Sequence, residues 1–339
     1  MTPTTAATSA TRAGRLRRGA LALATSLTLG LSGCGLGTAG GFVSSGELAG
    51  PLAGVPPLEG AQIAVGSKNF TEQLVVGKMA VILFASAGAD VQDLTNIPGS
   101  STTRQAQVSG ELDMVFEYTG TAWIAYMGET EPIPDEQEQY RAVAERDREN
   151  GLTWLEPAPM NNTYGMAVTQ ETVEEYGIST LSDMAEVPVE ERTFCVESEF
   201  NSRNDGLRPM LETYGVPVGT EVPEDNIKIF DTGAIYAATA NGECTFGEVF
   251  TTDGRIVALD LEVLEDDKKF FPNYNLAAVV QQDVLAEHPQ IEQLLTPVTE
   301  ELTDEVMLEL NAQVDVEGRD PADVAYEWLV AEGFITPSA

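Results

Sequence analysis

Three side chains able to hold a charged organic solute stand at the ends of predicted strands. Lys68, one of only five lysines in the chain, follows a short apolar strand. Tyr118 and Phe250 end two further predicted strands, and they follow Gly110 and Gly242 by the same spacing. Ring faces attract an ammonium group, and a lysine attracts a carboxylate. Such a cleft would suit a zwitterion. The alternative interpretation is that the rings pack in the core and the charge is solvated.

The segments that position these residues alternate between strand and helix patterns. In the first half we expect strands at 63–65, 91–97 and 112–116, with helices at 69–87 and 100–109. Asn69 lies three residues before Glu72, which is typical of a helix N-cap with its capping-box partner. The same order recurs downstream as strands at 193–196, 227–230 and 244–249, with helices at 205–214 and 233–240. This alternation predicts parallel sheets and an α/β fold.

The repeat predicts two similar α/β lobes, each a mostly parallel sheet flanked by helices. Crossing strands at 163–168 and 276–280 would join them, and helices at 291–295, 300–311 and 321–332 would pack back on the first lobe. We expect lobe one to comprise residues 61–161 and 275–339, and lobe two to comprise 162–274. Open α/β sheets bind ligands beyond the carboxyl ends of their strands. The predicted site therefore lies where the strand ends of the two lobes face each other.

The first 33 residues are typical of a targeting segment. Four arginines precede a short apolar run that ends in Leu31-Ser32-Gly33-Cys34. This ending resembles the lipobox of bacterial lipoproteins, in which the cysteine is lipidated and becomes the new N-terminus. The alternative is an ordinary signal peptide, 1–33, with a chance cysteine. Residues 34–60 are rich in Gly and Pro, so we expect a flexible tether that holds an extracytoplasmic, lipid-anchored protein at the cell membrane.

The charge and the cysteine content of the chain indicate which partners and which cellular compartment to expect. The chain has 18 Lys and Arg against 54 Asp and Glu, a formal net charge of −36. Nucleic acid is therefore not an expected partner, because phosphate contacts need clustered basic residues. The large excess of acidic residues would fit a protein from an organism of a saline habitat. Outside the cytoplasm Cys195 and Cys244 would pair as a disulfide, because they lie on neighbouring strands of lobe two. The alternative is two buried free thiols.

The sequence gives little support to an enzyme. Its one histidine, His288, precedes a proline near a predicted helix start, which favours a surface position. The zinc-protease and nucleophile-elbow motifs are absent, and no phosphate-binding glycine loop is present. We therefore expect no catalytic residue, no metal and no cofactor. The Asp253-Gly254 pair is typical of a turn rather than of a ligand contact.

Six short motifs occur along the chain in a fixed order: 66–73 (GSKNFTEQ), 117–121 (EYTGT), 161–164 (NNTY), 203–206 (RNDG), 252–256 (TDGRI) and 270–274 (FFPNY). Together they resemble the binding proteins of osmoprotectant ABC importers, the ProX-like family that takes glycine betaine, choline, carnitine and related solutes. The resemblance implies a two-lobed periplasmic-binding-protein (Venus flytrap) fold. It also implies a protein that captures a quaternary ammonium solute and delivers it to an ABC permease.

The same resemblance implies a ligand site. The family's aromatic cage falls on Tyr118, Tyr164 and Tyr274, with Phe250 at a position where the family usually has tyrosine. Matching further motif positions gives carboxylate-holding and polar residues: Lys68, Arg203, Thr121 and Asn162. Some members carry Asp in place of Asn162. A binding protein for an amino acid or another small solute remains the main alternative, followed by a sensor or adhesion lipoprotein.

Overall fold

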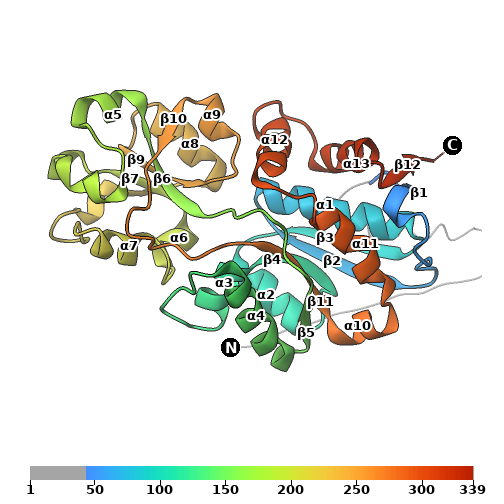
Figure 1. Cartoon of the computed structure of the whole chain (residues 1–339). Helices are drawn as coiled ribbons and strands as arrows, with labels where there is room; N and C mark the ends of the chain where they lie inside the picture. Colours follow the sequence, from blue (N-terminus) through green and yellow to red (C-terminus); the bar gives the residue numbers. More distant parts are fainter. Residues whose placement is uncertain (1–42, 339) are drawn as a thin grey trace, which may run out of the picture. The chain divides into compact units, whose positions relative to one another are not determined.

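The computed structural model describes residues 43–338. The predictions for the signal peptide and for lipidation of Cys34 lie outside these described residues. Two five-stranded sheets with flanking helices form the fold, and we call them, with their helices, lobe one and lobe two (Figure 1). None of the helices in the described part of the chain is long and apolar enough to cross a membrane.

Lobe one contains a sheet with the strand order β3-β2-β4-β11-β5. Its strands are β2 (Gln62–Lys68), β3 (Asp90–Ile97), β4 (Met114–Tyr118), β5 (Leu152–Trp154) and β11 (Leu276–Gln281). Its helices are α1 (Thr71–Ser86), α2 (Ser100–Val108), α3 (Thr119–Thr121), α4 (Glu136–Asp147), α10 (Gln282–Glu287), α11 (Gln290–Thr299), α12 (Asp304–Asp315) and α13 (Pro321–Ala331). Strand β2 pairs in parallel with β3 and β4, whereas β11 runs antiparallel to β4 and β5.

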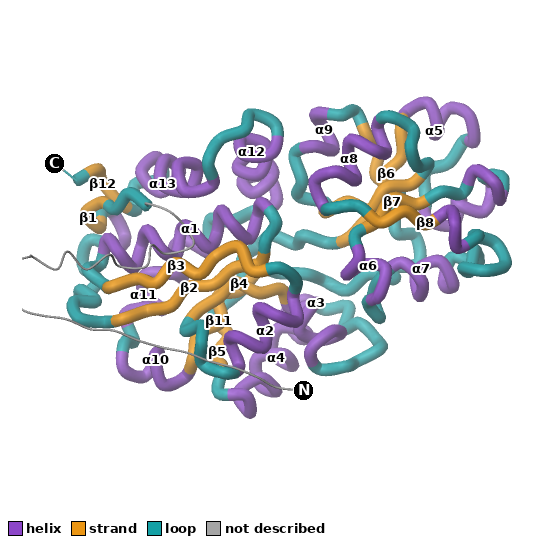
Figure 2. Tube along the Cα trace, turned by 180° about the vertical axis from the view of Figure 1, so that it is seen from behind, coloured by secondary structure: helices purple, strands orange, loops and turns teal. Residues whose placement is uncertain are grey.

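The sheet of lobe one is buried on both faces. Met114 and Phe116 of β4 enter the core cluster that includes α1, whereas Val115 enters the cluster that includes Tyr140 and Val143 of α4. This alternation is the two-residue period of a strand covered by a layer on each side. Helices α11, α12 and α13 pack against α1, so the three predicted C-terminal helices do return to lobe one (Figure 2).

Lobe two contains a sheet with the strand order β10-β6-β9-β7-β8. Its strands are β6 (Tyr164–Thr169), β7 (Phe194–Val196), β8 (Ile227–Ile229), β9 (Phe246–Phe250) and β10 (Leu261–Val263). Its helices are α5 (Gln170–Tyr176), α6 (Ser198–Ser202), α7 (Leu207–Thr213), α8 (Thr232–Ala240) and α9 (Arg255–Ala258). Strand β7 pairs in parallel with β8 and β9, and β6 runs antiparallel to β9 and β10.

The two sheets repeat one topology, as the sequence predicted. Strands β2, β3 and β4 correspond to β7, β8 and β9, and in both lobes the first of the three lies in the middle. The opposed strand in each sheet is a crossing strand, β11 in lobe one and β6 in lobe two. Gly110 and Gly242 both adopt positive φ, 80° and 73°, in the turn before the third strand. Because of this turn, the third strands begin two residues later than expected, at Met114 and Phe246 rather than at 112 and 244.

The prediction of a tether is wrong for the described part of the segment. Gly46–Leu48 form β1, which pairs antiparallel with β12 (Ile335–Pro337) at the other end of the chain. Leu52 and Leu58 are fully buried in the core of lobe one. Two leucines thus anchor a Gly- and Pro-rich stretch that the composition alone would leave free, because burial of each apolar side chain stabilises the folded state by about 1.5–3 kcal/mol.

The predicted capping box at the start of α1 is also wrong. The N-cap is Phe70, which has no side-chain cap. Asn69 Oδ1 instead accepts a hydrogen bond from the Gly99 amide, and the Glu72 carboxylate points into the interior. Glu72 finds several side-chain donors there, so it does not turn back to the helix terminus.

Candidate functional site

The predicted site residues meet at a small pocket between the strand ends of the two lobes. We call it the cage pocket. Its lining residues are Lys68, Phe70, Ser100, Tyr118, Thr121, Asn162, Tyr164, Phe250 and Tyr274. This set includes every residue proposed from the sequence as a ligand contact except Arg203. The volume of the cage pocket is about 30 Å³.

Five aromatic rings form a continuous series around the cage pocket. The ring centroids of Phe70 and Phe250 are 5.1 Å apart, and those of Tyr164 and Phe250 are 5.4 Å apart. Tyr164 meets Tyr274 edge-on at 5.5 Å, and Phe70 stacks on Tyr118 at 6.2 Å. These distances lie in the range of direct aromatic contacts.

Sequence reasoning missed Phe70 as a member of this series. It lies two residues beyond Lys68, at the end of β2, and within the first of the six motifs. Its position at a strand end, next to a predicted ligand contact, was the signal that could have identified it.

Two of the three phenol groups of the cage, those of Tyr118 and Tyr274, are held by buried carboxylates. Tyr118 donates from its hydroxyl to Glu72 Oε1 at 2.6 Å, and Tyr274 donates to Asp205 Oδ2 at 2.7 Å. Burial and the neighbouring carboxylates raise the pKa of both tyrosines well above its usual value, so both remain donors. A Cβ added at Gly120 would lie 2.6 Å from the Asn273 carbonyl oxygen, so glycine allows this segment to approach Tyr274.

Glu72 connects several elements behind the cage. Its Oε1 accepts from Tyr118 and from Asn162 Nδ2 at 2.9 Å. Its Oε2 accepts from Thr252 Oγ1 at 2.6 Å and from Asn311 Nδ2 at 3.2 Å. Burial raises the pKa of Glu72, and these four hydrogen bonds oppose that effect. Because Thr252 follows β9 in lobe two, this carboxylate joins the two lobes.

The two predicted cations of the site already have carboxylate partners. Lys68 Nζ forms a buried ion pair with Glu117, and it lies 4.8 Å from the centroid of the Tyr118 ring. Arg203 binds both oxygens of Asp205, with each N–O distance 2.6 Å. Its guanidinium lies 5.4 Å from the centroid of the Tyr164 ring. Lys68 therefore lines the cage pocket, whereas Arg203 supports the cage from outside it.

Thr121 and Asn162 are the other polar residues of the cage pocket that the sequence predicted as ligand contacts. Thr121 is buried at the start of the segment that follows β4. Asn162 donates to Glu72, but its Oδ1 is buried without a hydrogen-bond partner among the described residues.

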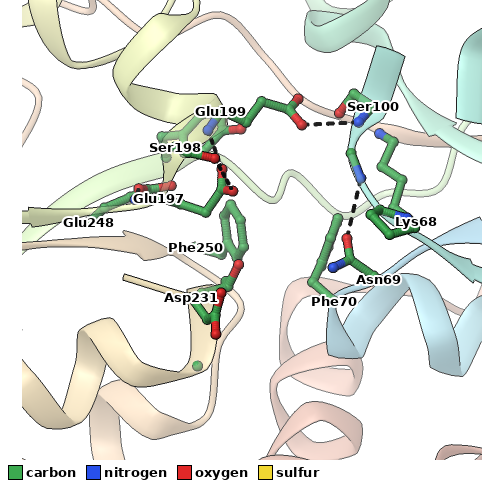
Figure 3. Close-up of a pocket in the computed structure, with 15 residues that line it drawn as sticks. Lys68, Asn69, Phe70, Ser100, Glu197, Ser198, Glu199, Asp231, Glu248 and Phe250 are labelled. Carbon is green, nitrogen blue, oxygen red and sulfur yellow. Dashed lines mark hydrogen bonds between the residues drawn. The ribbon is translucent and has the colours of Figure 1, made fainter. Parts of the chain in front are cut away.

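A larger cleft of about 530 Å³ adjoins the cage pocket (Figure 3). Phe70 and Phe250 line it from opposite sides, and Glu199 reaches from lobe two to accept the Ser100 amide of lobe one at 3.0 Å. Burial acts to raise the pKa of Glu199, but hydrogen bonds from Ser100 and nearby positive charges hold it below its usual value. Burial raises the pKa of Glu248, on the same wall, to about 8. Four carboxyl groups line this wall of the cleft from lobe two: Glu197, Glu199, Asp231 and Glu248.

A disulfide joins Cys195 of β7 to Cys244, which precedes the neighbouring strand β9. The bond closes a sequence separation of 49 residues inside lobe two. Within residues 43–338, no group of three or more His, Cys, Asp or Glu side chains is arranged to hold a metal ion.

Comparison with known proteins identifies the family. A family model described as the substrate binding domain of ABC-type glycine betaine transport systems matches residues 61–331. A glycine-betaine-binding protein of Pseudomonas aeruginosa is 39% identical over 275 residues, which are 79% of this chain and 86% of the relative. The glycine betaine-binding protein YehZ of Escherichia coli is 33% identical over 288 residues, which are 82% of this chain and 93% of the relative.

A solved structure supports the same assignment. The crystal structure of a glycine betaine/carnitine/choline ABC transporter protein superimposes with a TM-score of 0.65 at 26% identity. The match covers 80% of this chain and 98% of that protein. The two-lobed α/β fold predicted from the sequence is therefore confirmed, and the chain belongs to the family of substrate-binding domains of ABC-type glycine betaine transport systems.

Proposed function

We propose that this protein captures a quaternary ammonium osmoprotectant, such as glycine betaine, choline or carnitine, in the cage pocket and delivers it to an ABC permease. The observation that carries the proposal is the series of five rings from both lobes around one pocket. A trimethylammonium group has no N–H to donate, so hydrogen bonds cannot recognise it. Ring faces can, at about 0.5–2 kcal/mol for each contact, depending on desolvation.

The size of this effect is sufficient for useful affinity. Several ring contacts together supply several kcal/mol, a substantial part of the roughly 8 kcal/mol that micromolar binding requires. Lys68 lines the cage pocket, so we propose that it meets the carboxylate of a zwitterionic solute. We propose the same role for Arg203, although it is bound to Asp205 and lies against the ring of Tyr164. A ligand carboxylate would therefore compete with a protein carboxylate for each cation.

An amino acid is the less favoured solute because the nearby carboxylates are already engaged. A primary or secondary ammonium needs an acceptor for each N–H. Glu72 accepts four hydrogen bonds from the protein. Glu117 accepts from Lys68, from the Tyr118 amide and from the Tyr126 hydroxyl. The ring faces can thus contact an ammonium group, whereas these two carboxylates already accept hydrogen bonds from the protein.

Calorimetry on the purified protein tests the proposal directly. Glycine betaine, choline, carnitine, ectoine and proline form a panel that separates trimethylammonium solutes from other osmolytes. We expect saturable binding of at least one trimethylammonium compound and much weaker binding of proline. Tighter binding of proline or of another amino acid would favour the alternative. A panel without any binding would favour a sensor or adhesion role.

We further propose that the protein is extracytoplasmic and that a lipid on Cys34 attaches it to the cell membrane. The support is the Leu31-Ser32-Gly33-Cys34 sequence after a basic and then apolar leader. Stable attachment requires more than one acyl chain, which lipoprotein processing supplies. Cys34→Ala should move the protein from the membrane fraction to the soluble fraction. Unchanged fractionation of Cys34→Ala would contradict this anchor.

We also propose that the lobes rotate about the crossing segments, with lobe one as residues 61–161 and 275–339 and lobe two as 162–274. The support is that Asn161 and Asn275 form an isolated antiparallel bridge at these limits. Asn161 Oδ1 also accepts the Tyr274 amide at 2.7 Å. The two segments are therefore held to each other where the chain passes between sheets.

A further inference from the structure

The loop of residues 252–255, between β9 and α9 of lobe two, makes a contact with lobe one apart from the solute cleft. The Thr252 hydroxyl donates to Glu72 Oε2 at 2.6 Å, and the Thr252 carbonyl oxygen accepts from Asn311 Nδ2 at 3.0 Å. Arg255 lies 3.5 Å from Asp315 at the end of α12. We call this segment the 252–255 loop. It joins lobe two to α1 and α12, the latter coloured red in Figure 1.

Gly254 is the point of closest approach in this contact. A Cβ at this position would lie 2.5 Å from Ala312 Cβ, 2.7 Å from Ala312 Cα and 3.0 Å from its backbone nitrogen. The Gly254 backbone itself has φ −63° and ψ −18°, a conformation open to any residue. The turn geometry expected for the Asp253-Gly254 pair is thus not the reason for glycine here. The reason is helix α12 of the opposite lobe.

The 252–255 loop is connected to cage residues through side-chain contacts in both lobes. Arg255 is bound to Asp253, and its guanidinium lies 4.3 Å from the centroid of the Tyr236 ring. The Tyr236 hydroxyl in turn accepts the amide of Phe250, a cage residue, at 3.0 Å. On the opposite side, Glu72 binds both Thr252 and the Tyr118 hydroxyl. A displacement of the loop from α12 would therefore act on Phe250 through Tyr236, and it would break the bond from Thr252 to Glu72, which also holds Tyr118.

We propose that packing of the 252–255 loop against α12 is required for the cage to close on its solute, and that Gly254 sets how closely the lobes approach. This inference rests on the proposed function for its ligand. Gly254 is a positioning residue, because it does not line the cage pocket. A methyl group at this position would hold the lobes apart without altering any residue that lines the pocket.

Gly254→Ala tests this inference on the full chain purified in detergent. We expect binding of glycine betaine or choline about tenfold weaker or more, mainly through faster dissociation, because a contact this short cannot be relieved locally. The melting temperature of the ligand-free protein should fall only slightly, because the clash is relieved by separating the lobes rather than by unfolding either one. A lower melting temperature with unchanged affinity would overturn the proposal.

Two further variants make this result specific. Gly54→Ala is a matched control, because no atom lies within 4 Å of the added Cβ and Gly54 does not have positive φ. It should bind solute as the wild type does. Gly254→Val is the second variant, because its larger side chain meets the same backbone atoms of Ala312 and should weaken binding at least as much as Gly254→Ala does. Affinity of Gly254→Val at the wild-type level would contradict the proposed contact.

A distance measurement separates this proposal from the proposed function. Spin labels at Val257→Cys and Val316→Cys, both exposed, would report the separation of the lobes beside the loop, with Cys34→Ser preventing stray labelling. Gly254→Ala should shift the distances to larger values, with or without solute. Unchanged distances would overturn the role of Gly254. If the wild type binds no solute of the panel, the proposed function fails, and these distances alone decide whether the loop contact controls the lobes.

Discussion

The ring centroids of Phe70 and Phe250 lie 5.1 Å apart, although Phe70 follows a strand of lobe one and Phe250 ends a strand of lobe two. This contact is the point at which the two halves of the cage meet. A cation between these rings would touch both lobes at once. Solute binding would therefore favour the arrangement in which the lobes are close, as expected for a ligand that prefers one of two conformations.

Phe250→Ala should weaken solute binding by about 1–2 kcal/mol, because one desolvated cation–π contact and its packing are lost. Phe250→Tyr should change affinity by about 1 kcal/mol or less, since the ring face is retained. Calorimetry and thermal unfolding of both variants provide the check. If Phe250 belonged only to the core of lobe two, Phe250→Ala would lower the melting temperature and leave the affinity of the folded fraction nearly unchanged.

Phe70→Ala should produce a similar loss, about 1–2 kcal/mol in affinity, because its ring lines the pocket from lobe one. Phe70→Leu is the matched control, since it keeps apolar volume and removes the ring face. Both variants should bind trimethylammonium solutes more weakly by similar amounts in calorimetry. Full affinity in Phe70→Leu would show that Phe70 contributes packing and not attraction for a cation.

Arg203→Ala should weaken glycine betaine binding more than choline binding, because choline has no carboxylate for Arg203 to bind. The comparison uses the ratio of the two dissociation constants, so a general loss of folded protein cancels. Arg208→Ala is a suitable control, since Arg208 forms an exposed pair with Glu224 at 2.9 Å. Equal losses for both solutes would mean that Arg203 acts by holding Asp205 and Tyr164 in place.

Replacement of both Cys195 and Cys244 by alanine should lower the free energy of unfolding by about 4 kcal/mol on the chain-entropy model for a loop of this length. Urea unfolding of the double variant measures the change. Mass spectrometry of the wild type after alkylation without reduction should find neither cysteine modified. Alkylation of both residues under those conditions would mean that the purified protein lacks the bond.

Glu248 should make stability fall as pH rises. Burial raises the pKa of Glu248 to about 8, whereas an unfolded glutamate titrates near 4.5. Between these values the folded chain holds the extra proton, so the free energy of unfolding decreases with increasing pH. The difference approaches roughly 4–5 kcal/mol once Glu248 is ionised.

Urea unfolding of the wild type and of Glu248→Gln between pH 5 and pH 9 measures this effect. In the variant, the free energy of unfolding should not decrease with pH through this group. The variant should therefore be the more stable protein above pH 8. Because other buried carboxyls also titrate, the informative quantity is the difference between the two proteins at each pH. A difference that does not change with pH would contradict the prediction.

The sequence by itself determined the architecture and indicated most of the residues that line the cage pocket. Alternating apolar segments predicted two lobes, because strand and helix periods are local properties of the chain. The parallel placement of Tyr118 and Phe250 after Gly110 and Gly242 located both strand ends, since each glycine permits the positive φ of the preceding turn. Ordered motifs then indicated the residues that line the cage pocket.

Only the tertiary structure decided which residues act together across long separations. The partners of Glu72 come from four distant segments, so a capping box was the only role that its neighbours along the chain could indicate. Leu52 and Leu58 looked like parts of a tether because their core comes from elsewhere in lobe one. Gly254 looked like a turn residue because the helix that excludes its Cβ lies almost sixty residues later. Local propensity is set by neighbours along the chain, whereas close packing and hydrogen bonding are set by neighbours in space.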